Sequence, residues 1–169
     1  MASRSFISSL FLLILCGHLS AQENVKIARG DFKTGIDIGF KEAWSSIQQG
    51  DKNYKAGKGT YDIARDHYLF ANQYNPENPQ LNYKLGVCYL FTDEKYEAIA
   101  YFQRAYTLDH KVSKNINYLL GQSYQLVLEF DKAIRFFAAR HRHFDDSAFY
   151  KSQQRLLYAL TTDIFCRRV

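Results

Sequence analysis

Apolar residues recur along the chain at the spacing of one helix face, and the pattern returns after a fixed interval. The run Asn82 to Tyr89 (NYKLGVCY) reappears as Asn117 to Tyr124 (NYLLGQSY), a shift of 35 residues that preserves Asn-Tyr, Leu-Gly and the final Tyr. Within each run the leucine and the last tyrosine lie four residues apart, which places them on one side of a helix. The sequence therefore predicts repeated amphipathic helices.

The segments that follow these runs repeat as well. Ala64, Ala98 and Ala133 are spaced by 34 and 35 residues, and each begins a similar apolar stripe. Small residues at these positions allow a second helix to pack closely on the first, and the aromatic residues continue its buried face. The predicted repeat positions are Ala64, Tyr68, Ala71, Leu85, Gly86, Tyr89, Ala98, Phe102, Ala105, Leu120, Gly121, Tyr124, Ala133 and Phe137.

A self-similar period of 34 to 35 residues with these positions resembles the tetratricopeptide repeat family. The resemblance implies an all-α solenoid of helix-turn-helix units, with repeats at about 40–76, 79–110 and 114–145 inside an array spanning 40–146. Gly86 and Gly121 are expected to lie where the second helix of a repeat approaches the first. In the first repeat, Gly57 to Thr60 inserts one or two residues, so the register of its first helix (about Phe40 to Lys55) stays open.

The two ends of the chain follow other patterns. Residues 1–21 combine a basic start at Arg4, an apolar run from Phe6 to Leu15, and the small residues Ser20 and Ala21, which is the layout of a secretory signal peptide. The alternative is a lipoprotein signal cleaved before Cys16. Residues 22–39 show little periodicity and are expected to form a loose arm, whereas 147–169 are expected to form a C-terminal capping helix and tail.

Composition narrows the possible functions. The chain has 22 basic and 17 acidic residues spread along it, a net charge of +5 that is too mild to indicate a nucleic-acid partner. The apolar run of residues 6–15 is too short to span a bilayer, so no transmembrane helix is expected in the mature chain. Cys88 lies in an apolar helical pattern and is expected to be a small buried residue; whether it pairs with Cys166 stays open.

The sequence contains only weak candidates for a phosphate-binding, metal-binding or catalytic site. Gly57-Lys58-Gly59-Thr60 lacks the upstream glycine and the hydroxyl residue directly after lysine that a phosphate-binding loop requires. The metal-ligand types at 141–146 (His141, His143, Asp145 and Asp146) have no matching second cluster, which favours a solvated repeat end. We therefore expect no enzyme activity and no cofactor. The rival interpretation is a small enzyme or a metal protein that uses residues 141–146.

The resemblance implies a function by binding. Repeats of this family usually bind a protein or peptide on the concave face formed by their first helices. The repeat register assigns to that face Tyr83, Val87, Leu90, Tyr118, Gln122 and Gln125. For Tyr83 and Tyr118, packing between repeats is an equally good interpretation.

A more specific resemblance covers about Phe40 to Phe137, which looks like the N-terminal repeat segment of OmpA-family cell-envelope proteins. It implies an exported, periplasmic or outer-membrane-associated scaffold that binds a protein or peptide of the envelope. The alternatives are a truncated N-terminal part of an OmpA-like peptidoglycan-associated protein, or a structural subunit that self-associates within an envelope assembly.

Overall fold

The structure, a computed structural model, describes residues 23, 25–35 and 38–141. This part of the chain is all-α, as predicted, with no strand among its elements. The predicted signal peptide, the C-terminal cap and the cysteine at position 166 lie outside the described residues. The helices are α2 (Arg29–Phe32), α3 (Phe40–Ala56), α4 (Tyr61–Tyr74), α5 (Pro79–Leu90), α6 (Ala98–Leu108), α7 (Ile116–Leu126) and α8 (Phe130–His141), with short 3₁₀ turns at Lys58–Thr60 and Lys95–Glu97.

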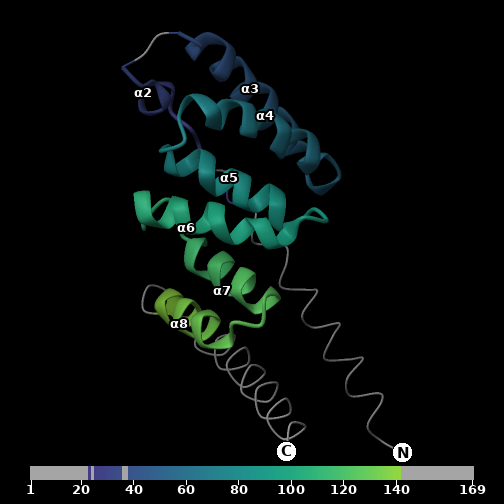
Figure 1. The fold of residues 1–169 in the computed structure, drawn as a ribbon, viewed down its shortest axis with the longest axis vertical. Helices are drawn as coiled ribbons and strands as arrows, with labels where there is room; N and C mark the ends of the chain where they lie inside the picture. Colours follow the sequence, from purple (N-terminus) through teal and green to yellow (C-terminus); the bar gives the residue numbers. More distant parts are fainter. Residues whose placement is uncertain (1–22, 24, 36–37, 142–169) are drawn as a thin grey trace, which may run out of the picture.

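Six of these helices form three antiparallel pairs. α3 packs on α4, α5 on α6, and α7 on α8, while α4 against α5 and α6 against α7 join successive pairs. Figure 1 shows the pairs stacked one above another along the long axis of the molecule. The arrangement is a helical solenoid in which each pair contacts only its neighbours.

Local sequence explains where the pairs join. Asn78 caps α5, since its side-chain oxygen accepts a hydrogen bond from the Leu81 amide at 2.8 Å, and Pro79 occupies the first helical turn. The Asn75 side chain accepts from the Glu77 amide at 3.0 Å and holds the turn that precedes the cap. These polar turn residues end one pair and begin the next.

Each pair is closed by a glycine that faces an aromatic ring. A Cβ added to Gly86 would lie 2.6 Å from the Phe102 ring, and one added to Gly121 would lie 2.5 Å from the Phe137 ring. Both distances are too short for real atoms, so only glycine lets the second helix come this close, as the sequence predicted. The α3 helix has the same contact, because a Cβ on Gly50 would lie 2.6 Å from Tyr68.

This third contact settles the register of the first pair. Phe102 and Phe137 each follow their glycine by 16 residues, whereas Tyr68 follows Gly50 by 18. The two additional residues are accommodated in the Gly57 to Thr60 turn, where Gly57 has φ +104° and Thr60 Oγ1 donates to the Asn53 carbonyl at 2.7 Å. That segment is a structural connection between α3 and α4.

The core includes the repeat positions, other apolar residues of the six paired helices, and residues before the array. The alanines Ala64, Ala98 and Ala133 have no exposed surface, and the remaining predicted repeat positions are buried as well. Cys88 is also fully buried, as predicted.

Residues 25–32 are packed rather than loose, which corrects the expectation for the N-terminal arm. Phe32 is completely buried against Phe40, Trp44 and Tyr74, with ring centroids 5.4 to 6.4 Å apart. Val25 and Ile27 are 8% and 7% exposed and belong to the same core. Their burial follows from an extended alternation of apolar and polar residues, a pattern with period two that a search for helices does not detect.

Candidate functional site

The structure corrects half of the predicted concave surface. Tyr83 and Val87 have no exposed surface, and Tyr118 is 8% exposed, so these side chains cannot present a face to a partner. Tyr83 packs edge-on against Phe102 at 6.0 Å, and Tyr118 packs against Phe137 at 5.8 Å. Both tyrosines therefore hold the two helices of their own pair together.

Leu90, Gln122 and Gln125 are partly exposed. Leu90 and Gln125 occupy the same position in successive pairs, 35 residues apart, and Gln122 is oriented by its side-chain amide, which donates to the Tyr118 hydroxyl at 3.0 Å. These three side chains are the accessible remainder of the predicted surface.

A buried ion pair joins the first two helix pairs, and the sequence did not indicate it. The Lys84 ammonium on α5 donates to the Asp51 carboxylate on α3, and the Lys84 side chain is only 1% exposed. The Tyr68 hydroxyl donates to the same Asp51 oxygen at 2.7 Å. Lys84 Nζ also lies over the rings of Tyr54 and Tyr68, at 5.2 and 5.7 Å from their centroids.

Burial controls the protonation of this cluster. It lowers the pKa of Lys84, and the Asp51 carboxylate opposes that shift by favouring the charged amine. Burial also raises the pKa of Tyr54 and Tyr68, and it raises the pKa of the nearby Cys88 thiol to about 12. All three are therefore protonated at neutral pH, so the cluster offers neither a thiolate nor a phenolate nucleophile.

The repeat register shows that this cluster is particular to one interface. Positions equivalent to Asp51, Lys84 and Tyr68 in the following pairs are Val87, Leu119 and Phe102, all fully buried. The same contact is thus ionic between the first and second pairs and apolar between the second and third. Comparing Lys84 with Leu119 in the aligned repeats is the sequence signal that could have revealed it.

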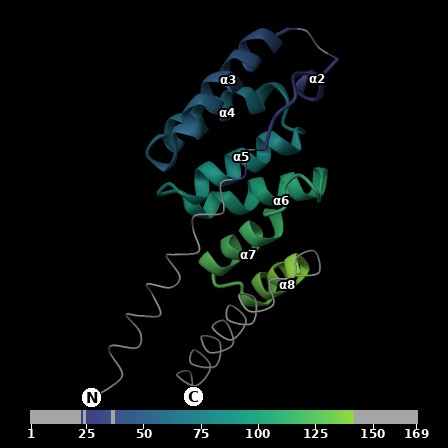
Figure 2. The same ribbon diagram turned by 180° about the vertical axis from the view of Figure 1, so that it is seen from behind.

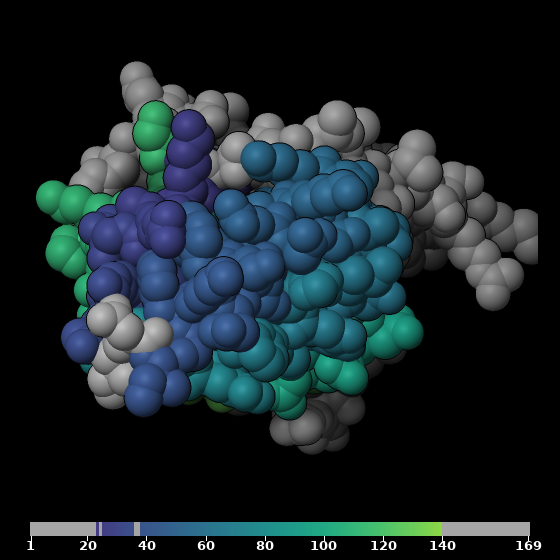
Figure 3. Space-filling model, turned by 90° about the horizontal axis from the view of Figure 1, so that it is seen from above, coloured from purple at the N-terminus to yellow at the C-terminus, as the bar shows by residue number. Residues whose placement is uncertain are grey.

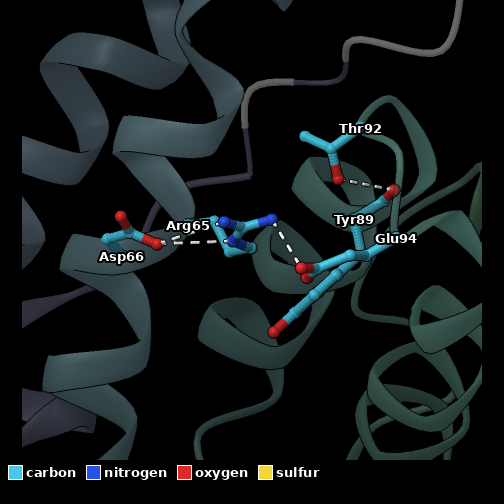
Figure 4. Close-up of polar contacts among 5 residues, drawn as sticks. All are labelled: Arg65, Asp66, Tyr89, Thr92 and Glu94. Atoms are coloured by element: carbon cyan, nitrogen blue, oxygen red, sulfur yellow. Dashed lines mark hydrogen bonds and ion pairs between the residues drawn. The ribbon is translucent and has the colours of Figure 1, made fainter.

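A second polar contact links the same two pairs on their surface. Arg65 of α4 donates to Glu94 at 3.2 Å and to Asp66 at 3.4 Å, and its guanidinium lies 5.3 Å from the centre of the Tyr89 ring (Figure 4). The Thr92 hydroxyl donates to the Tyr89 carbonyl at 3.1 Å and fixes the turn after α5. These exposed contacts position the turn and carry little stability individually.

The outer face of the first pair is an open groove of about 650 Å³ between α3 and α4. Figure 3 looks onto this end of the array, where the blue helices α3 and α4 form the surface beside the purple α2 segment. Within the groove the Ser46 hydroxyl donates to the His67 carbonyl at 2.9 Å. The lining is Lys41, Glu42, Ser45, Ser46, Gln49, Asp66, His67 and Phe70, a mixed polar and apolar set.

The remaining candidate site is a metal-binding cluster. No three His, Cys, Asp or Glu side chains come together at metal-binding distance within the described residues. The proposed metal cluster at 141–146 lies outside the side chains that the structure describes.

None of the helices placed by the structure combines the length and apolar character needed to cross a membrane. Comparison with known proteins found no matching protein-family model and no matching curated protein.

Proposed function

We propose that the chain is a non-catalytic protein-interaction module of the tetratricopeptide repeat type, exported to the bacterial cell envelope. The observation that carries the repeat assignment is the glycine-to-aromatic contact present in all three helix pairs, at Gly50, Gly86 and Gly121. Stacked pairs of this kind form extended surfaces on which proteins and peptides bind. Export is supported by the signal-like pattern of residues 1–21.

The binding surface that we propose for this module is the row Leu90, Gln122 and Gln125, which are partly exposed. Its mixture of one aliphatic and two amide side chains suits a partner segment that offers both backbone hydrogen bonds and apolar side chains. This row of side chains thus recognises its partner through shape and backbone contacts rather than through charge.

Site-specific photo-cross-linking in the native host tests this proposal. A photoreactive amino acid at Leu90 or Gln122 is expected to cross-link the full chain to a discrete envelope protein. The same group at Thr107, which is exposed on the second helix α6, is the matched control and is expected to give no such product. Identical products from all three positions, or none from any, would refute the proposed surface.

A second candidate is a structural subunit that self-associates. It is favoured by Ile63 and Phe70, which lie two turns apart on α4 and are 47% and 51% exposed. Light scattering over a range of protein concentrations distinguishes the two functions. A mass that rises with concentration, and that Phe70→Ser returns to the monomer, supports the subunit, and a constant monomer mass supports the adaptor.

A further inference from the structure

The segment before α2 lies along the array as a bound extended peptide. Val25 and Ile27 are buried, whereas Lys26 and Ala28 are exposed. This alternation is typical of an extended chain that lies with one face against a surface. Ala28 has extended backbone angles, φ −79° and ψ 137°. Figure 2 shows the segment, in purple, running from α2 past α5.

Side chains anchor this segment at both ends. The Glu23 carboxylate accepts hydrogen bonds from Ser113 Oγ at 2.5 Å and from the Lys114 amide at 3.0 Å, in the loop between α6 and α7. At the other end the Asn75 side-chain amide donates to the Phe32 carbonyl at 2.9 Å, in the loop between α4 and α5. The segment therefore crosses the edge of the array at which successive helix pairs are joined.

The surface below the segment is selective in its chemistry. In the loop before α7, a hydroxyl and a backbone amide donate hydrogen bonds to a carboxylate. Tyr83 lies close enough for the charge of Glu23 to affect its pKa. Burial raises the pKa of Tyr83, the nearby Ser113 hydroxyl opposes that shift, and the charge of Glu23 adds a smaller increase. Two buried aliphatic positions follow the carboxylate at the second and fourth residues, so the surface accepts the pattern Glu-x-Val-x-Ile.

We propose that this surface is a binding site for an extended partner peptide, in which a carboxylate is followed at the second and fourth residues by β-branched aliphatic side chains. Glu23 and residues 25–27 of the chain itself occupy the site, and a partner binds by displacing them. The segment is joined covalently to α3, so it stays attached to the array when it is displaced. The inference rests on the proposed function as an interaction module and identifies its partner by chemistry.

A labelled synthetic peptide covering residues 22–28 tests the site in the full chain. The double variant Val25→Asp with Ile27→Asp weakens the internal segment at its buried positions. Lys26→Asp with Ala28→Asp adds two carboxylates at the exposed positions and is the matched control. We expect the peptide to bind the first variant at least about tenfold more tightly than the control or the wild type, because the internal competitor is removed.

The specificity of the peptide is tested in parallel. A peptide carrying Ile27→Asp or Glu23→Ala is expected to lose binding to the first variant. Equal affinity for all peptides, or equal binding by all chain variants with helicity retained, would overturn the site. A doubled mass, with the segment exchanged between two copies of the chain, would refute the proposal of a separate partner and show that a second copy of the chain occupies the site.

A second design covers the case in which the aspartate variant fails to fold. A protease recognition sequence inserted after Gly35 allows the internal segment to be cut while the array stays intact. Excess of a longer peptide that covers residues 22–35, and so replaces the buried Phe32 contacts as well, is expected to displace the cut segment on gel filtration. Retention of the cut segment against this longer peptide would overturn the proposal. Both designs use a synthetic peptide only, so their result is independent of whether cross-linking at Leu90 and Gln122 finds a cellular partner.

Discussion

Replacing Asp51 by Asn leaves the Lys84 ammonium buried without its counter-charge. The Lys84 side chain is 1% exposed, and burial alone already lowers its pKa. Removing one partner of a buried ion pair typically costs about 3 to 5 kcal/mol. Near pH 7 the loss of stability cannot exceed about 4.6 kcal/mol, which is the cost of deprotonating an amine whose unperturbed pKa is about 10.4. If leaving the charge buried costs more than this, Lys84 loses its proton instead. The Asp51 side chain is 28% exposed, which places the expected loss near 3 kcal/mol at the lower end of that range.

The repeat itself supplies the matched control. The triple variant Asp51→Val, Lys84→Leu and Tyr68→Phe gives the first interface the residues found at Val87, Leu119 and Phe102. Replacing a buried ion pair by well-packed apolar groups is often neutral or stabilising by about 1 to 4 kcal/mol. Tyr68→Phe is included because the tyrosine hydroxyl would otherwise lose its acceptor.

Urea unfolding followed by far-UV circular dichroism measures both variants. The loss in the Asp51→Asn variant should shrink as the pH rises towards 10, by up to about 1.4 kcal/mol per unit. The sign follows because Asp51 opposes the lowering of the Lys84 pKa by burial, so the folded variant releases this proton at a lower pH than the folded wild type. Over that interval the unfolded variant binds more protons than the folded variant, and the variant gains stability as the pH rises. A loss below about 1 kcal/mol for Asp51→Asn, or a triple variant as unstable as the single one, would refute the reasoning.

Three further predictions concern the core. Gly86→Ala should destabilise the array by about 1 to 3 kcal/mol in urea unfolding, because the new Cβ would meet Phe102, while Gly59→Ala, with no atom within 4 Å, should be near neutral. Burial raises the pKa of Tyr61 to about 12, so thermal melting at several pH values should show stability falling above about pH 10, where only the unfolded chain ionises. Cys88, with its pKa raised by burial, should resist thiol reagents in a Cys16→Ser, Cys166→Ser chain until denaturant is added; rapid labelling of the folded chain would contradict its burial.

The sequence determined the repeat and the helix type because both are local properties. Leucine and tyrosine at helical spacing, with a glycine and an alanine at fixed places in each unit, specify which faces are buried, whichever helices lie beside them. For the same reason the asparagine and proline at positions 78 and 79 could be identified as a helix start. The close approach at Gly86 and Gly121 also followed from residue size alone.

Only the tertiary structure decided which side chains remain accessible. Tyr83 and Tyr118 share a register position that could serve either a groove or the core, and the distance to Phe102 and Phe137 placed them in the core. The Asp51 to Lys84 contact spans 33 residues between helices of different pairs, so no local pattern encodes it. The placement of Glu23 depends likewise on a loop about 90 residues away in the chain, at Ser113 and Lys114. Periodicity specifies which face of an element is apolar, but the partner of that face is set by how the elements pack.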